Sequence, residues 1–227
     1  MKHNTAILVM ALGLVLLAGT VPTDAVPMLR LTVDGVVGLP VSDGGAGDAN
    51  PVVGAVTLMG AAGAFSVNVS TGISKPVLGI AASPSMDLNS VDVSSLSGPH
   101  QLILEFSDTG FGPVNSAFQL GIGGTTNGSV LYQAYLDPLN ANFATTTLLS
   151  SVGPLSTSAF SGSASSSVFS LAGPFSLTQK VTINVAGTGT SSFNATLAVP
   201  EPGPLLLLGT GLLGVGLLGS RLKRLRR

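Results

Sequence analysis

The sequence contains no cysteine, and this absence removes several kinds of chemistry at once. Disulfide bonds, thiolate metal sites and cysteine nucleophiles are all excluded. Small exported domains often depend on disulfide bonds, but a domain of about 175 residues can bury enough apolar surface to fold without them.

Aromatic residues and charges are also scarce. Tryptophan is absent and the only tyrosines are Tyr132 and Tyr135, so few rings are available for stacking against sugars or bases. Charged residues make up 8% of the chain and apolar residues 45%, a mixture too apolar for a disordered chain. Five of the nine basic residues stand in the last seven positions, which leaves the middle of the chain mildly acidic. Without a basic patch there, nucleic acid is not expected as a partner.

The N-terminal segment has the pattern of a signal peptide. Lys2 precedes an uncharged apolar stretch, residues 6–18, which suits a signal-peptide core and is short for a membrane span. Thr23-Asp24-Ala25 offers a small-x-small cleavage site. We therefore predict that residues 1–25 are a signal peptide used by the Sec export machinery, and that the body begins at Val26.

The C-terminal segment has the pattern of a membrane anchor. Pro200 and Pro202 interrupt regular structure, since proline cannot donate a backbone hydrogen bond. Residues 205–222 are apolar, and eighteen helical residues would cover about 27 Å, close to the hydrocarbon thickness of about 30 Å. Clustered basic residues stay on the cytoplasmic side, so residues 26–202 are expected outside. The predicted stop-transfer residues, within the basic end 221–227, are Arg221, Lys223, Arg224, Arg226 and Arg227.

The order Pro-Glu-Pro, short Leu/Gly-rich helix and Arg-rich end resembles the PEP-CTERM sorting signal of Gram-negative bacteria. The resemblance covers residues 199–227 and implies that a membrane-embedded exosortase recognises Pro200, Glu201 and Pro202 and processes the chain near them. It also implies a setting of exopolysaccharide and biofilm production. The expected location is an inner-membrane-anchored precursor that later reaches the cell surface or the extracellular matrix. Residues 26–198 more loosely resemble the uncharacterised β-rich cargo domains found ahead of this tail.

The body alternates apolar and polar residues with a period of two, for example in residues 65–70 and 181–185. This pattern predicts half-buried strands of antiparallel sheets, and no stretch of the body has an amphipathic helical pattern. The fold class is therefore predicted as all-β, with a single β-sandwich or jelly-roll-like domain over residues 26–198. The predicted strands are residues 29–33, 53–58, 65–70, 77–81, 86–93, 101–106, 117–122, 130–135, 181–185 and 193–197.

Turns are predicted where glycine, proline, asparagine and aspartate cluster. They include residues 43–45, 60–63, 97–99, 108–110, 127–128 and 137–138. The apolar positions of residues 86–93 change parity around Ser90, which predicts a β-bulge. The uncharged Ser/Thr-rich segment 145–170 is predicted as a strand pair, and the alternative is a flexible stretch carrying O-linked sugar.

No catalytic residue is predicted from the sequence. Serine catalysis needs a base, and His100 is the only histidine of the body. It follows a Ser-Gly-Pro turn and is expected to be a solvated surface group. A hydrolase with paired carboxylates could combine Glu105 with Asp87 or Asp92, but few aromatic rings accompany them.

A glycine-rich acidic loop is the best ligand-binding candidate. Asp43, Asp48 and Asn50 could supply oxygen ligands to Ca²⁺, which takes six to eight oxygens. The alternative is an ordinary acidic loop, because Asp, Asn and Gly favour turns for conformational reasons. No other cofactor is predicted.

Two classes of function remain open. The first is a structural protein of the cell surface or extracellular matrix, which we favour. The second is a non-catalytic carbohydrate-binding module of the exopolysaccharide matrix, for which Tyr132 and Tyr135 would be the available aromatic rings.

Overall fold

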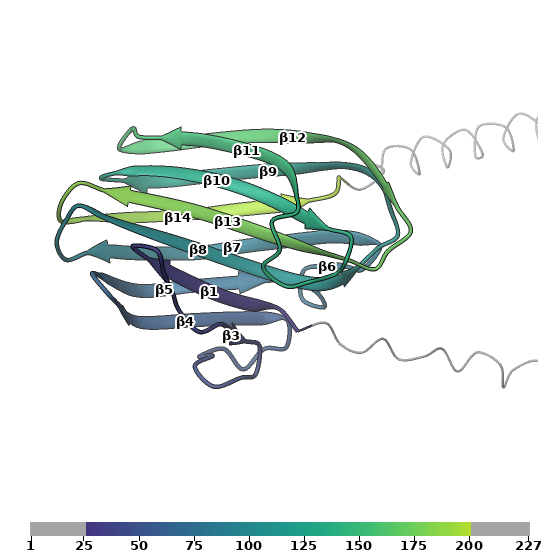
Figure 1. The fold of residues 1–227 in the computed structure, drawn as a ribbon, viewed down its shortest axis with the longest axis horizontal. Coiled ribbons are helices and arrows are strands. Elements are labelled where there is room, and N and C mark those ends of the chain that lie inside the picture. Colours follow the sequence, from purple (N-terminus) through teal and green to yellow (C-terminus); the bar gives the residue numbers. More distant parts are fainter. Residues whose placement is uncertain (1–25, 201–227) are drawn as a thin grey trace, which may run out of the picture.

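The computed structural model describes residues 26–200, and every regular element in that range is a β-strand (Figure 1). This confirms the all-β prediction. Residues 26–200 contain no helix long and apolar enough to cross a membrane. The predicted signal peptide and the predicted membrane helix at 205–222 lie outside the described residues.

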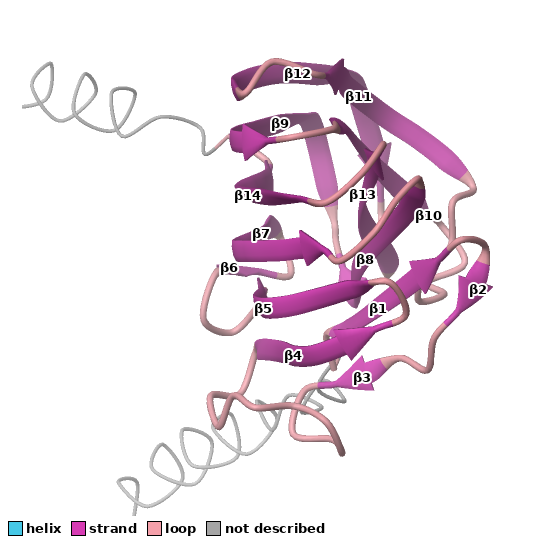
Figure 2. Ribbon diagram, turned by 90° about the vertical axis from the view of Figure 1, so that its left-hand side faces the viewer, coloured by secondary structure: helices cyan, strands magenta, loops and turns pink. Residues whose placement is uncertain are grey.

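The strands form two antiparallel sheets that face each other as the two layers of a sandwich (Figure 2). In spatial order, sheet A contains β11 (Thr147–Leu155), β10 (Ser129–Asp137), β13 (Phe175–Val185), β8 (His100–Phe111), β1 (Met28–Val33) and β2 (Val36–Val37), and β3 (Val41–Ser42) also pairs with β1. Sheet B contains β12 (Ala159–Leu171), β9 (Val114–Thr126), β14 (Gly189–Ala198), β7 (Ser83–Ser95), β5 (Phe65–Ile73) and β4 (Ala55–Ala62), and β6 (Gly79–Ile80) also pairs with β7.

The core lies between the two sheets and is built from the alternating apolar positions of both. Leu102, Leu104 and Phe106 of β8 are fully buried, while the residues between them point to the other face of sheet A. At one end of the core the rings of Phe118 and Phe175 meet edge to face, with centroids 6.4 Å apart. One continuous apolar layer therefore joins the sheets, as sandwich packing requires.

Two finer features predicted from the sequence pattern are confirmed. The Ser/Thr-rich segment forms two successive strands, β11 and β12. They lie at the same edge of the sandwich, one in each sheet. The pairing of β14 with β7 shifts register between Phe193 and Ala195, opposite the predicted bulge. On either side of that shift, Leu88 and Val91 are both buried, because the extra residue restores the inward face.

Three local predictions are wrong. The turn predicted at 60–63 is displaced, because β4 extends to Ala62 and the turn lies at Gly63 and Ala64. The segment Asp108-Thr109-Gly110 is not a turn, because β8 continues through it to Phe111. Asp108 is fully buried there, and its carboxylate lies 2.7 Å from Lys75 Nζ. The predicted strand at 77–81 is reduced to the two residues of β6.

Candidate functional site

A row of polar side chains crosses the outer face of sheet A. Glu105 of β8 is the direct partner of both Arg30 in β1 and Lys180 in β13. Lys180 in turn pairs with Gln133 of β10, and Gln133 with Ser151 of β11. Directly paired residues share one face of a sheet, and the neighbours of these residues point into the core. The row therefore faces away from the core.

One end of the row is an ion pair covered by an aromatic ring. Both Nε and Nη2 of Arg30 donate to Oε2 of Glu105, at 2.9 Å and 2.7 Å. The ring of Phe143 lies against the guanidinium, with its centroid 4.2 Å from the central carbon. The ring therefore stacks on the cation of the pair, and Glu105 is only 5% exposed.

Phe143 belongs to the loop 138–146, which several hydrogen bonds hold over the end of sheet A. The carboxylate of Asp137 accepts the Ala141 amide and the Thr146 hydroxyl, both at 2.9 Å. The hydrogen bond from the Ala141 amide is the largest influence lowering the pKa of Asp137. The amide of Phe143 donates to Ser107 Oγ at 3.0 Å. The loop is therefore fixed to the sheet through polar groups at both ends.

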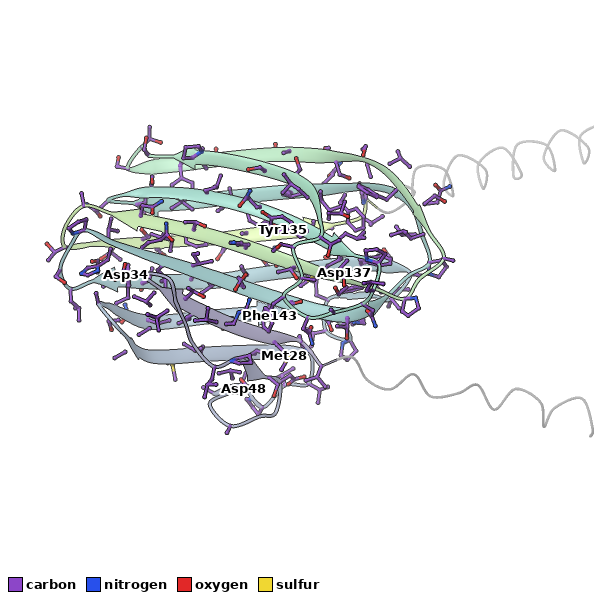
Figure 3. The ribbon with its side chains drawn as sticks, in the orientation of Figure 1. Met28, Asp34, Asp48, Tyr135, Asp137 and Phe143 are labelled. Atoms are coloured by element: carbon purple, nitrogen blue, oxygen red, sulfur yellow. The ribbon has the colours of Figure 1, made fainter. Side chains whose placement is uncertain are left out.

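The two tyrosines have different places in the fold. Tyr135 lies on the outer face, one row from Gln133, and is half-buried (Figure 3). Burial, with the nearby charge of Glu105, raises its pKa. Tyr132 points into the core and is 0% exposed, so the expectation that both rings could meet a sugar is wrong. Its hydroxyl is used inside the fold, where it accepts from Gln179 Nε2 at 2.7 Å.

The acidic loop places Asp43, Asp48 and Asn50 near one another through backbone hydrogen bonds. The carboxylate of Asp48 accepts three amides, those of Gly44, Asn50 and Thr57, at 2.9–3.0 Å. Asp43 Oδ2 accepts the amide of Gly54 at 2.6 Å. No three acidic or histidine side chains within residues 26–200 gather in a way that could hold a metal ion. Calcium binding by this loop stays a prediction, while the hydrogen bonds show that these carboxylates organise the loop.

The carboxylates proposed as a hydrolytic pair are separated by the sandwich. Glu105 lies on the outer face of sheet A, where it bonds Arg30. Asp87 and Asp92 alternate with the buried Met86, Leu88 and Val93 of β7, which places them on the outer face of sheet B. A catalytic pair of Glu105 with either aspartate is therefore ruled out by the fold.

His100 is not the solvated surface group that the sequence suggested. Its ring is half-buried at the start of β8, and both nitrogens have partners. Nδ1 lies 2.7 Å from Asp34 Oδ2, and Nε2 lies 3.1 Å from Ser97 Oγ. Sequence reasoning did not consider Asp34 and Ser97 as partners of His100. The Asp34-Gly35 pair between apolar residues was an available signal, because Asp-Gly is typical of a two-residue hairpin turn.

The C-terminal segment matches a known family. The family described as "PEP-CTERM protein-sorting motif" matches residues 198–227. The chain therefore carries this motif in the place that the resemblance indicated. The motif marks an exported precursor that is anchored in the membrane and sorted to the cell surface. Of its residues, Pro200 is described by the structure, whereas Glu201, Pro202 and the basic end lie outside the described range.

No curated protein sequence matches the chain. Among solved structures, the carbohydrate-binding module TmCBM61 with β-1,4-galactotriose is 10% identical at a TM-score of 0.33, and the match covers 68% of this chain and 92% of that one. The enzymatically active domain of tailspike protein 4 from bacteriophage CBA120 is 13% identical at a TM-score of 0.33, over 61% of this chain but only 20% of the other. The C-terminal CBM6 of LamC from Zobellia galactanivorans is 12% identical at a TM-score of 0.27, and the match covers 48% of this chain and 89% of that one. Similarities this low do not bear on function.

Proposed function

We propose that this chain is a structural protein of the cell surface or extracellular matrix of a Gram-negative bacterium, delivered through exosortase processing near Pro200–Pro202. The observation that carries the proposal is the sorting motif at 198–227, which begins at the last residue of β14, the final strand of the β-sandwich. The sandwich buries a continuous core without disulfide bonds, which suits a durable exported domain.

The matrix role is tested by deleting the gene in the native host and complementing it. We expect loss of matrix cohesion on deletion, and recovery with the wild-type chain. Complementation by a Glu201→Ala variant should fail, because the precursor would remain uncut in the inner membrane. Full recovery with that variant would contradict the role of the tail.

The outer face of sheet A supports a second candidate, non-catalytic binding of polysaccharide. Tyr135 offers a ring face there, and Gln133 and Lys180 offer donors one row away. Sugar binding commonly combines an aromatic ring with neighbouring polar groups, and this is the part of residues 26–200 where a tyrosine and such groups lie together.

Affinity electrophoresis in gels containing exopolysaccharide extracted from the native host tests this candidate. Retention should fall for Tyr135→Ala and stay unchanged for Gln119→Ala, a matched change of an exposed residue on sheet B. Equal retention of both variants, or no retention of the wild type, would reject polysaccharide binding and leave only the structural role.

A further inference from the structure

Asp34, His100 and Ser97 form a continuous chain of hydrogen bonds at one end of the sandwich. The two contacts join Asp34 Oδ2 to His100 Nδ1 at 2.7 Å and His100 Nε2 to Ser97 Oγ at 3.1 Å. These are the distances that a nucleophile needs from its base, and a base from the group that orients it. Asp34 comes from the β1–β2 turn, Ser97 from the turn before β8 and His100 from the start of β8, so the fold assembles the arrangement.

The β1–β2 turn fixes the carboxylate. Asp34 and Gly35 both have positive φ, 49° and 81°, as a tight turn of two residues between Val33 and Val36 requires. The Asp34 amide donates to the Gln101 carbonyl at 3.0 Å, and Asp34 Oδ1 accepts the Gln101 amide at 2.9 Å. The second carboxylate oxygen is thereby directed at His100.

The carboxylate also selects the tautomer of His100. The Gln101 amide, followed by His100 itself, lowers the pKa of Asp34, so this group is an acceptor at neutral pH. Nδ1 of His100 must then carry the proton that it donates, and the lone pair of a neutral ring lies on Nε2. Nε2 is therefore able to take a proton from Ser97. The ring of Phe65, edge to face at 6.3 Å, supports the imidazole from the core.

The turn that carries Ser97 is also fixed. The Leu96 amide donates to the Ala64 carbonyl at 3.0 Å. Gly98 packs so closely on Gly187 that a Cβ at position 98 would lie 2.5 Å from the Gly187 backbone. Ser97 itself is exposed, so its hydroxyl can be reached from solvent.

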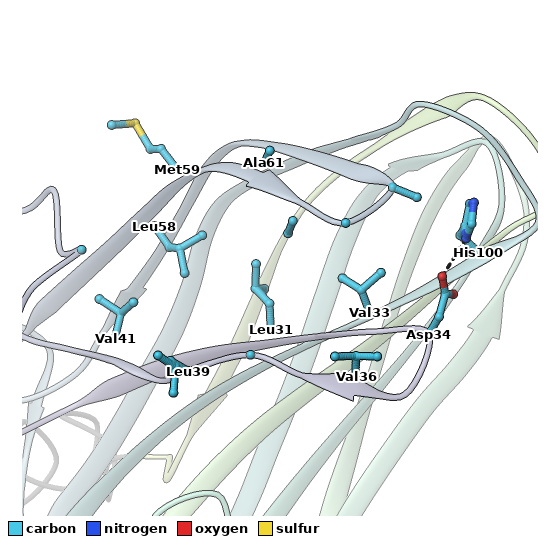
Figure 4. A pocket seen from close by; sticks show the side chains of 15 residues that line it. Leu31, Val33, Asp34, Val36, Leu39, Val41, Leu58, Met59, Ala61 and His100 are labelled. Atoms are coloured by element: carbon cyan, nitrogen blue, oxygen red, sulfur yellow. Dashed lines mark hydrogen bonds and ion pairs between the residues drawn. The ribbon is translucent and has the colours of Figure 1, made fainter.

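An open apolar pocket of about 700 Å³ adjoins Asp34 and His100, while Ser97 lies outside its lining. Asp34 and His100 form one end of it, and Leu31, Val33, Leu58 and Met59 line the remainder (Figure 4). An apolar acyl or alkyl group would lose its contact with water there, while a polar carbonyl group would stay near the histidine.

We propose that Ser97 and His100 are the catalytic nucleophile and base of an esterase site, positioned by Asp34, for carboxylic esters that carry an apolar group. Ser97 Oγ bonds to the ester carbonyl carbon as its proton passes to His100 Nε2. The bond to the alcohol oxygen then breaks, and the same proton goes to the leaving alcohol. Water attacks the acyl-serine, gives a proton to His100 and releases the acid, and the proton returns to Ser97.

The first test is labelling of the full chain with a fluorophosphonate probe, followed by peptide mass spectrometry. Ser97 should be labelled, and Ser97→Ala should abolish labelling and the hydrolysis of p-nitrophenyl butyrate. His100→Gln should lower the hydrolysis rate by roughly 10²- to 10⁴-fold. Ser94→Ala removes a neighbouring hydroxyl that lies 3.4 Å from Thr190 Oγ1 and not beside His100, so it is the matched control and should behave as wild type. An unlabelled wild type, or labelling that survives Ser97→Ala, would overturn the proposal.

A second test uses the absence of cysteine, because Ser97→Cys introduces the only thiol of the chain. A thiol beside His100 should react with iodoacetamide at pH 7 about tenfold faster than the thiol of Ser94→Cys. Adding Asp34→Asn should remove that difference without changing the circular dichroism spectrum, as expected of a positioning residue. Equal reactivity of the two single variants would contradict the role of His100.

Discussion

The hydroxyl of Tyr132 donates a hydrogen bond of 2.9 Å to the carbonyl oxygen of Thr196, and this bond crosses from sheet A to sheet B. It lies in the core, where Gln179 Nε2 donates to the same hydroxyl and to the Ala195 carbonyl. A polar connection therefore fixes how the two sheets sit on each other. Burial also raises the pKa of Tyr132, so the hydroxyl stays protonated as a donor.

Tyr132→Phe should destabilise the fold by about 1–2 kcal/mol, because it leaves the Thr196 carbonyl without this donor in a buried place. Urea unfolding followed by circular dichroism measures the change. Tyr135→Phe is the control, since it removes a hydroxyl from the half-buried outer face and should cost far less. Equal losses in the two variants would mean that the inter-sheet bond contributes nothing.

The ion pair of Lys75 with Asp108 predicts a second change in stability. Burial raises the pKa of Asp108, and the Lys75 charge opposes that rise. Lys75→Met should cost about 3–5 kcal/mol at pH 7, because it leaves a buried carboxylate without its cation. Lys180→Met, on the outer face of sheet A, should cost less than about 1 kcal/mol.

The pH dependence of Lys75→Met follows from the same shift. A carboxyl whose pKa is raised on folding favours the folded state below its unfolded value of about 3.9, and this contribution is lost as pH rises. The deficit of Lys75→Met relative to wild type should therefore shrink between pH 7 and pH 4 in thermal melts. A deficit that is constant with pH would show that Asp108 is not the group responsible.

Asp137 should behave in the opposite way. Its lowered pKa means that it stabilises the fold above about pH 4 and that this contribution is lost as pH falls through the folded value. Asp137→Asn should lower the melting temperature at pH 7 and flatten its decline below pH 4. An unchanged decline in acid would contradict the anchoring of the loop 138–146 by this carboxylate.

In thermal melts, Asp48→Ala should destabilise the fold at the acidic loop by about 1–3 kcal/mol, because three backbone amides lose their acceptor.

Thermal melts of the wild type test whether the acidic loop binds calcium. A ligand that binds only the folded state adds about 2.7 kcal/mol at one hundred times its dissociation constant. A wild-type melting temperature that is equal in millimolar calcium and in chelator would leave Asp43, Asp48 and Asn50 with a structural role alone.

Much of the fold could be predicted because most of the long strands bury one face. The alternation Leu102, Leu104, Phe106 fixes which side meets the core, and a shift of one residue would expose all three. Even the uncharged segment 145–170 kept enough apolar anchors, such as Leu149 and Phe160, to form strands.

The errors arise from contacts between residues distant in sequence. Asp108 stands in an Asp-Thr-Gly sequence that is typical of turns. Inside β8, however, its carboxylate is paired with the ammonium group of Lys75, 33 residues earlier in the chain. His100 meets Asp34 across 66 residues, through the register of β1 with β8. A single sequence carries no record of such register, so neither partner could be assigned from it.

The central claim is that this β-sandwich is exported and then released from its sorting tail. Intact-mass spectrometry of the protein isolated from the surface fraction of the native host tests it most directly. We expect a chain that begins near Val26 and ends near Pro200, with a mass well below the 22.5 kDa of the full sequence. We also expect that Glu201→Ala keeps the tail and stays with the inner membrane. A surface-located chain that still ends at Arg227 would contradict the account.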